Sequence, residues 1–190
     1  MMNSILDLPS IRARVSRTTV EEYHRQPERN ANGKRTELIR GIVIEKMSKS
    51  PKHKSLSTRL YRHILKHLPE GFSAWKEEPL SLSDSEPEPD VSVLRGDWSE
   101  FEMRHASSAA LVVEVAVSSP KDDQALASIY AEAGVVEYWI VLAHERAIEV
   151  HRRPEGGRYR EMRVYGEGEE IVAAGVPGLR IAVAELFAGL

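Results

Sequence analysis

The stretch Ala109–Ser119, AALVVEVAVSS, decides the fold that we predict for this chain. Residues 109–117 form an almost unbroken apolar run, which is typical of a strand covered on both faces of a sheet. Glu114 interrupts this run near its centre. A carboxylate in such surroundings is costly unless a cation, hydrogen-bond donors or a proton compensates its charge. The stretch therefore predicts a central strand that carries a functional acid.

A second acid, Asp90, directly precedes another apolar-rich run, Val91–Leu94, in the string PEPDVSVL. An acid that opens one strand and an acid inside the next can meet at one edge of a sheet. Two such carboxylates repel each other unless a positive charge lies between them, and a divalent cation supplies that charge. We predict a site built on Asp90 and Glu114, with Glu37 as a third oxygen ligand. The alternative is that these are separate surface acids, and for Glu37 alone this alternative is favoured.

The composition is that of an ordinary globular protein. A chain of 190 residues, 42% of them hydrophobic, is long enough to bury the core of one domain. The net charge of −3 excludes a molecule that is basic overall, so any nucleic-acid binding needs a local patch. The chain has no cysteine, which excludes disulfides and thiolate metal sites. No signal peptide or membrane-spanning run is visible, so we expect a cytoplasmic location and no membrane partner.

The pattern along the chain predicts an N-terminal arm, residues 1–17, followed by a single domain, residues 18–190. Strands alternate with two substantial helices, which indicates an α/β (α+β) fold with a mixed central β-sheet flanked by helices. Helices are expected at 20–26, 52–68 and 118–133, with a last helical turn at 183–187. Strands are expected at 36–47 (two strands hinged at Gly41), 72–82, 91–94, 109–117 and, as a C-terminal antiparallel meander, 137–142, 147–152, 158–165 and 169–173.

The predicted helix at 52–68 also holds a basic patch, since no acid occurs between Lys46 and Leu68. We predict that the patch binds nucleic acid through Lys52, Lys54, Arg59, Arg62 and Lys66. A solvated helix face is the commoner explanation for a charge run, and the absence of acids favours nucleic acid.

Three histidines of the same helix have structural interpretations. His63 and His67 stand four residues apart, as metal ligands on one helix face do, but two partly exposed histidines are the favoured interpretation. For His53, a packed structural histidine is favoured over a side chain that points towards the acids.

Several strings together resemble a bacterial family of restriction endonuclease-like proteins in the PD-(D/E)XK nuclease superfamily. They are TELIRGIVIEKM, the histidine in SPKHKSLSTRL, PEPDVSVL, LVVEVAVSS and IYAEAGVVEYWIVL, which span roughly residues 37–150 in the order of the family. The resemblance implies a restriction-endonuclease-like fold and hydrolysis of DNA phosphodiesters with Mg²⁺, or Mn²⁺ in its place. It also implies that Asp90, Glu114 and the carbonyl of Val115 bind the metal, and that Glu37 is the upstream catalytic glutamate.

The chain departs from the superfamily at its catalytic lysine. The superfamily normally has a lysine two residues after the glutamate, where this chain has Ala116. In this branch the following helix commonly supplies a lysine instead, at the position of Leu126. Lys121, at the start of that helix, is the candidate substitute and the fourth predicted catalytic residue, although an exposed first-turn lysine is the simpler interpretation. Loss of the lysine would remove charge stabilisation worth about 2.7–4 kcal/mol of barrier.

Two functions therefore follow from the sequence. The first is a Mg²⁺-dependent DNA endonuclease, impaired if nothing replaces the lysine. The alternative is an inactive protein of nuclease fold that binds nucleic acid or a protein partner. The apolar C-terminal residues Leu186, Phe187 and Leu190 either support a homodimer or cover the core.

Overall fold

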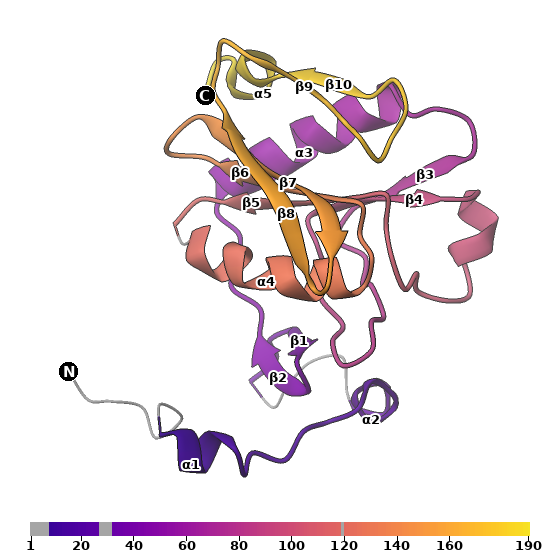
Figure 1. The fold of residues 1–190 in the computed structure, drawn as a ribbon, viewed down its shortest axis with the longest axis vertical. Coiled ribbons are helices and arrows are strands. Elements are labelled where there is room, and N and C mark those ends of the chain that lie inside the picture. Colours follow the sequence, from indigo (N-terminus) through magenta and orange to yellow (C-terminus); the bar gives the residue numbers. More distant parts are fainter. Residues whose placement is uncertain (1–7, 27–31, 119) are drawn as a thin grey trace.

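The computed structural model describes residues 8–26, 32–118 and 120–190 (Figure 1). The start of the predicted N-terminal arm and Ser119 lie outside these ranges. Six strands form the central sheet, in the order β3-β4-β5-β6-β7-β8. They are β3 (Phe72–Trp75), β4 (Val91–Arg95), β5 (Leu111–Ala116), β6 (Glu137–Leu142), β7 (Ala147–Glu155) and β8 (Arg158–Tyr165). Only β5 and β6 are parallel, so the sheet is mixed, as predicted.

The central strand β5 is buried along its whole length, as its apolar sequence predicts. It lies between β4 and β6, and Glu114 is opposite Ile140 in the parallel register with β6. A parallel pair needs a crossover connection, and helix α4 (Pro120–Glu132) provides it. Gly134 adopts a positive φ of 72° directly after the helix, which only glycine does at little cost, and the chain then enters β6.

Helix α3 (Pro51–Lys66) covers one face of the sheet (Figure 1). The Ser50 side chain caps its first turn by accepting a hydrogen bond from the backbone N–H of His53. The predicted stripe of Leu56, Leu60 and Ile64 is fully buried against the sheet. The short strands β9 (Glu170–Val172) and β10 (Arg180–Ala182) and helix α5 (Val183–Phe187) complete this layer.

Two of the three apolar C-terminal residues belong to the core, and the third, Leu190, is exposed. Leu186 and Phe187 are buried in the cluster that contains the α3 stripe. The Arg59 guanidinium donates hydrogen bonds to the carbonyl oxygens of Leu186 and Ala188, which fixes the end of the chain to α3. Of the two interpretations of the apolar C-terminus, the structure supports core coverage for these residues.

Helix α4 packs mainly under β5–β8 on the opposite face, and the β3–β4 half of that face is covered by loops. The loop at 96–106 contains a short 3-10 helix, η2 (Trp98–Phe101). The predicted strand at 72–82 is wrong beyond Trp75. Glu77 adopts a positive φ of 58° and Pro79 has no N–H, so the chain leaves the sheet there.

The N-terminal part of the described chain lies beside the loop that leads into β4. It comprises α1 (Pro9–Arg12), α2 (Val20–His24), β1 (Thr36–Ile39) and β2 (Ile42–Glu45). Arg40 and Gly41 both have positive φ, which gives the tight turn predicted between the two strands. The hairpin docks on the loop because Gly41 N–H donates to the carbonyl of Asp84 and Glu86 N–H donates to that of Leu38.

The predicted fold class is therefore confirmed: a mixed α+β protein with a central mixed sheet, helices on its faces and an antiparallel C-terminal meander. Within the described ranges, no helix is both long and apolar enough to cross a lipid bilayer.

Candidate active site

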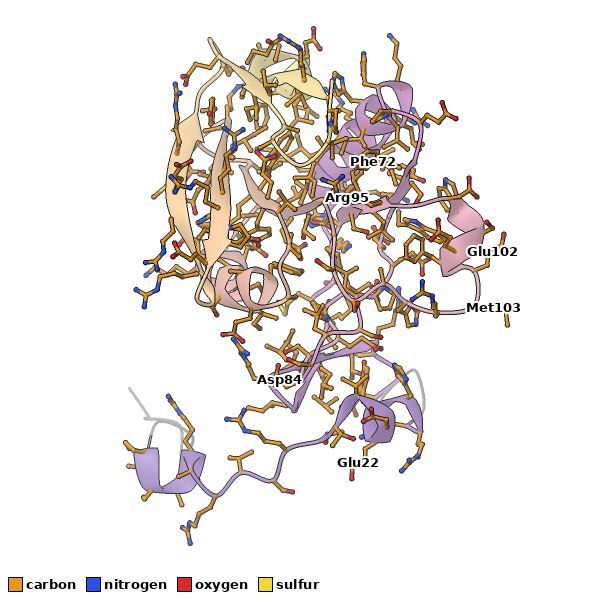
Figure 2. All side chains as sticks on the ribbon, turned by 45° about the vertical axis from the view of Figure 1, so that its right-hand side comes forward. Glu22, Phe72, Asp84, Arg95, Glu102 and Met103 are labelled. Atoms are coloured by element: carbon orange, nitrogen blue, oxygen red, sulfur yellow. The ribbon has the colours of Figure 1, made fainter. Side chains whose placement is uncertain are left out.

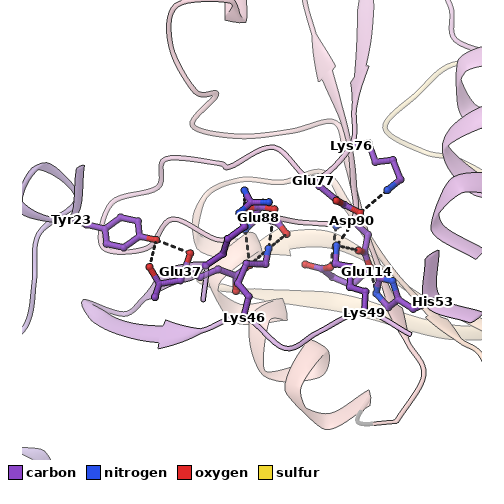
Figure 3. A network of polar contacts seen from close by, with 12 residues as sticks. Tyr23, Glu37, Lys46, Lys49, His53, Lys76, Glu77, Glu88, Asp90 and Glu114 are labelled. Carbon is purple, nitrogen blue, oxygen red and sulfur yellow. Dashed lines mark hydrogen bonds and ion pairs between the residues drawn. The ribbon is translucent and has the colours of Figure 1, made fainter. Parts of the chain in front are cut away.

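The two predicted acids, Asp90 and Glu114, meet at the end of β4 and β5 (Figure 3). Val91 pairs with Val113 in the antiparallel register, which brings the preceding Asp90 opposite Glu114. Glu114 Oε2 accepts a hydrogen bond from the backbone N–H of Asp90 at 3.1 Å. Asp90 Oδ2 accepts one from the backbone N–H of Val115 at 2.8 Å. Asp90 and Glu114 are both buried, so their carboxylates interact in a medium of low polarity.

Glu114 is held from the α4 side by a tyrosine. The Tyr130 hydroxyl donates to Glu114 Oε1 at 3.0 Å, and both residues are buried. Burial raises the pKa of Glu114 well above its usual value, and the neighbouring charges of Asp90 and Asp123 raise it further. Both effects disfavour the carboxylate, so a cation at this position would relieve them.

Asp90 has two nitrogen neighbours, the Lys49 ammonium and the His53 imidazole. Lys49 Nζ lies 2.6 Å from Asp90 Oδ1, and His53 Nε2 lies 2.9 Å from Asp90 Oδ2. Burial alone would raise the pKa of Asp90, but the His53 hydrogen bond and the Lys49 charge together lower it. His53 therefore points at the acids, although the sequence favoured a packed structural role. Its other nitrogen, Nδ1, is buried and has no hydrogen-bond partner in the described part of the chain.

The Lys49 ammonium bridges two acids. It also lies 3.2 Å from Glu77 Oε1, on the loop that follows β3. Burial alone would lower the pKa of Lys49, but the charges of Asp90 and Glu77 raise it above its usual value. Lys49 is thus a charged amine in direct contact with a predicted metal ligand.

Glu37 belongs to a neighbouring cluster rather than to the Asp90–Glu114 pair (Figure 3). Its Oε1 lies 2.8 Å from Lys46 Nζ and accepts a hydrogen bond from the backbone N–H of Glu88 at 3.1 Å. Lys46 Nζ also lies 3.1 Å from Glu88 Oε1. Glu37 is still close enough that its charge contributes to the raised pKa of Glu114.

Asp123, in the first turn of α4, is an acid that the sequence analysis missed. Its pKa is raised to about 7 by burial and then by the charges of Asp90 and Asp122. The only signal in the sequence was the acidic pair in PKDDQ, which reads equally well as a favourable first helical turn.

Comparison with known proteins shows which family the chain belongs to. A family model described as "Uma2: Putative restriction endonuclease" matches residues 20–184. The chain belongs to this family. Among solved structures it resembles "a putative nuclease belonging to DUF820" from Anabaena variabilis ATCC 29413, with a TM-score of 0.73 and 20% sequence identity. The match covers 90% of this chain and 97% of the other, and it shows a shared fold. No curated protein matches the chain.

In this Uma2 protein, the substitute lysine predicted from the sequence makes no hydrogen bond or ion pair with Asp90 or Glu114. Lys121 is exposed at the start of α4, and its amine makes no hydrogen bond or ion pair with any residue that the structure describes. Leu126 packs with the apolar cluster under the sheet. Lys49 is the amine that contacts the carboxylates, and it comes from the loop before α3.

The predicted nucleic-acid face of α3 divides into two groups. Two of its cations bind backbone carbonyls: Lys52 Nζ donates to that of Ala143 at 3.0 Å, and Arg59 holds the C-terminus. Lys54, Arg62 and Lys66 are exposed. Lys54 lies beside His53, whereas Lys66 is about 20 Å further along the helix axis.

The acids fit a hard cation through the chemistry of their donors. In the described ranges, no group of three or more histidine, aspartate or glutamate side chains is arranged to hold a metal ion. Mg²⁺ commonly binds through one or two carboxylates and keeps several waters, so a pair suffices. Burial is the first cause of the raised pKa values of Glu114 and Asp123, and a local excess of negative charge from neighbouring carboxylates raises them further. A divalent cation between Asp90 and Glu114 would offset that excess.

Proposed function

We propose that the chain is a metal-dependent DNA endonuclease that uses Mg²⁺ or Mn²⁺ to hydrolyse phosphodiester bonds. The observation that carries the proposal is the meeting of Asp90 and Glu114, with the Lys49 amine on Asp90. Membership of the Uma2 family and the nuclease-like fold support it.

Asp90 and Glu114 would hold the metal. The backbone N–H of Val115 faces Asp90, and the N–H and C=O of one strand residue point to the same side, so the Val115 carbonyl is a third ligand. A bound Mg²⁺ supplies a Lewis acid that polarises a phosphoryl oxygen and lowers the pKa of water. The chain itself orients the ligands, because Tyr130 and the backbone N–H groups fix the carboxylates.

Lys49 takes the place of the lysine that is absent at Ala116 and Leu126. Its ammonium neutralises the Asp90 carboxylate in the metal-free protein. With Asp90 holding the metal, the flexible Lys49 side chain would be free to face the scissile phosphate and would stabilise the charge that develops there. His53 then remains as the hydrogen-bond partner that orients Asp90.

Glu37 acts through Lys46 in this proposal. The Lys46 ammonium bridges Glu37 and Glu88 and so fixes the strand that enters the loop of Lys49. Glu37 is a positioning residue on this account. Lys54 extends the positive charge outward from the acids, and Arg62 and Lys66 would contact DNA phosphates further away.

The test is nicking of supercoiled plasmid with Mg²⁺, Mn²⁺ or EDTA. The proposal expects metal-dependent nicking in the wild type, its loss in Glu114→Ala and no change in the matched control Glu145→Ala, an exposed acid. Equal residual activity in the wild type and Glu114→Ala refutes it. Lys49→Met should reduce nicking by roughly 100-fold while Lys121→Met does not, and the reverse result would assign the role to Lys121.

A second candidate is a protein that binds DNA without cleaving it. The observation that favours it is the apolar side chain at both lysine positions of the family, Ala116 and Leu126. It expects salt-sensitive DNA binding without nicking in any metal. A gain of nicking in Leu126→Lys would then identify the missing amine as the defect.

A further inference from the structure

A large aromatic cleft lies next to the acids and has no role in the proposed chemistry. Its volume is about 1010 Å³, which is ample for a small planar ligand. Three aromatic side chains line it, Trp75 from β3 and Trp98 and Phe101 from η2. Arg104 and His105, from the same loop as η2, lie at its rim.

The aromatic rings form one surface. The ring centroids of Trp75 and Trp98 are 4.0 Å apart and those of Trp75 and Phe101 are 6.3 Å apart. Trp98 remains 42% exposed although it packs on Trp75, so its side chain is still accessible to a ligand. The Arg104 guanidinium lies over the Phe101 ring, 5.7 Å from its centroid, and adds positive charge at the edge of the surface.

The cleft and the acids share one face of the sheet. Trp75 pairs with Ser92, and both line the cleft. Ser92 follows Asp90 by two residues, a separation of about 7 Å along a strand. Glu77 follows Trp75 by two residues, on the loop after β3. The cleft is open because α4 packs mainly under β5–β8, so that only loops cover the β3–β4 half of this face. Glu102 and Met103, whose loop lies at the side of the molecule in Figure 2, also line the cleft.

We propose that this cleft binds one unpaired base of the DNA strand whose phosphate lies at Asp90 and Glu114. The inference rests on the proposed function and names its substrate: DNA with a single-stranded or extruded base next to the scissile bond. Every base has a π-face that stacks on an indole, and in a duplex neighbouring bases cover that face. The exposed Trp98 side chain provides the stacking surface, and Arg104 provides charge for the adjoining phosphate.

Binding measurements in EDTA test the proposal without cleavage. Fluorescence anisotropy compares three labelled DNAs of matched sequence: a single strand, a paired duplex and a duplex with one unpaired base. Wild type should bind the two DNAs with unpaired bases roughly tenfold more tightly than the duplex. Trp98→Ala should lose this preference and Trp98→Phe should keep most of it. Met162→Ala, an exposed apolar side chain on β8, is the matched control.

The outcomes separate the two proposals. Equal affinity for all three DNAs, or a preference that survives in Trp98→Ala, overturns the cleft assignment even if plasmid nicking is intact. Absence of nicking together with a preference that needs Trp98 overturns the nuclease and keeps the base site. Intrinsic fluorescence gives a second readout: an unlabelled single strand should quench the wild type more than Trp98→Ala, in which Trp75 remains the one tryptophan of the cleft. Equal quenching in the two proteins contradicts the assignment, and circular dichroism confirms that the variant is folded.

Discussion

Asp123→Asn should stabilise the metal-free protein at alkaline pH and much less at acidic pH. The folded-state pKa of Asp123 is about 7, against 3.8 for the unfolded chain. A pKa that is raised on folding means that the folded protein binds the proton more tightly. The stability that Asp123 contributes is therefore fully present below about pH 3.8 and is lost as the pH rises through about 7.

The size of the effect follows from the two pKa values. Each unit of difference corresponds to about 1.4 kcal/mol, so the rise from 3.8 to about 7 corresponds to roughly 4 kcal/mol when both states are ionised. Between about pH 4.5 and about pH 8.5 the unfolding free energy of the wild type should fall by about 3 kcal/mol through the ionisation of Asp123 alone. Asparagine cannot ionise, so the variant lacks this loss.

Urea unfolding in EDTA at the two pH values measures the effect. The quantity to compare is the difference in unfolding free energy between variant and wild type, because it isolates the Asp123 charge together with its effect on the pKa of Glu114. That difference should grow by about 3 kcal/mol from low to high pH in Asp123→Asn. The control Asp122→Asn, one residue away and exposed, should show little change. A difference independent of pH in Asp123→Asn would mean that its carboxylate is neither buried nor close to Asp90.

Three further predictions concern the metal, the C-terminus and a close contact. Adding Mg²⁺ at about a hundred times its dissociation constant should raise the unfolding free energy by about 2.7 kcal/mol, and excess EDTA should reverse this. An unfolding midpoint that does not change with Mg²⁺ contradicts the site. Arg59→Ala should lower the unfolding free energy by about 1–2 kcal/mol in urea titrations, because Arg59 binds C-terminal carbonyls, whereas the exposed Arg62→Ala should not. Gly175→Ala should lower the unfolding free energy by about 3 kcal/mol, since the added methyl group would overlap the carbonyl oxygen of Ala110. An unchanged melting temperature would exclude that contact.

The positions of Asp90 and Glu114 were predictable because each lies on a recognisable strand. The apolar run around Glu114 identifies a strand buried on both faces, and Val91–Leu94 identifies its neighbour. Once two strands pair, the period of two fixes which residues lie opposite each other. The two acids then meet whenever the register is right, as it is here.

Lys49, Glu77 and Asp123 were not predictable in the same way. Lys49 lies in a loop, and in the string KMSKSPKHK nothing local distinguishes it from Lys46 or Lys52. The three amines bind different groups, respectively Asp90, Glu37 and a backbone carbonyl. Which amine reaches which acceptor depends on where the loop crosses the end of the sheet. That path is a property of the tertiary structure.

The pairing of lysines with acids also changes the meaning of the acid-free stretch between Lys46 and Leu68. The sequence associated it with DNA phosphates, but its first lysines face carboxylates of the same chain: Lys46 faces Glu37, and Lys49 faces Asp90. An acid near these two lysines would repel the carboxylates that they neutralise, so the absence of acids at the start of the stretch needs no DNA. A divalent cation at Asp90 would compete with the Lys49 ammonium and free its charge for a phosphate. Metal binding and DNA binding should therefore reinforce each other, and Mg²⁺ should tighten DNA binding less in Lys49→Met than in the wild type.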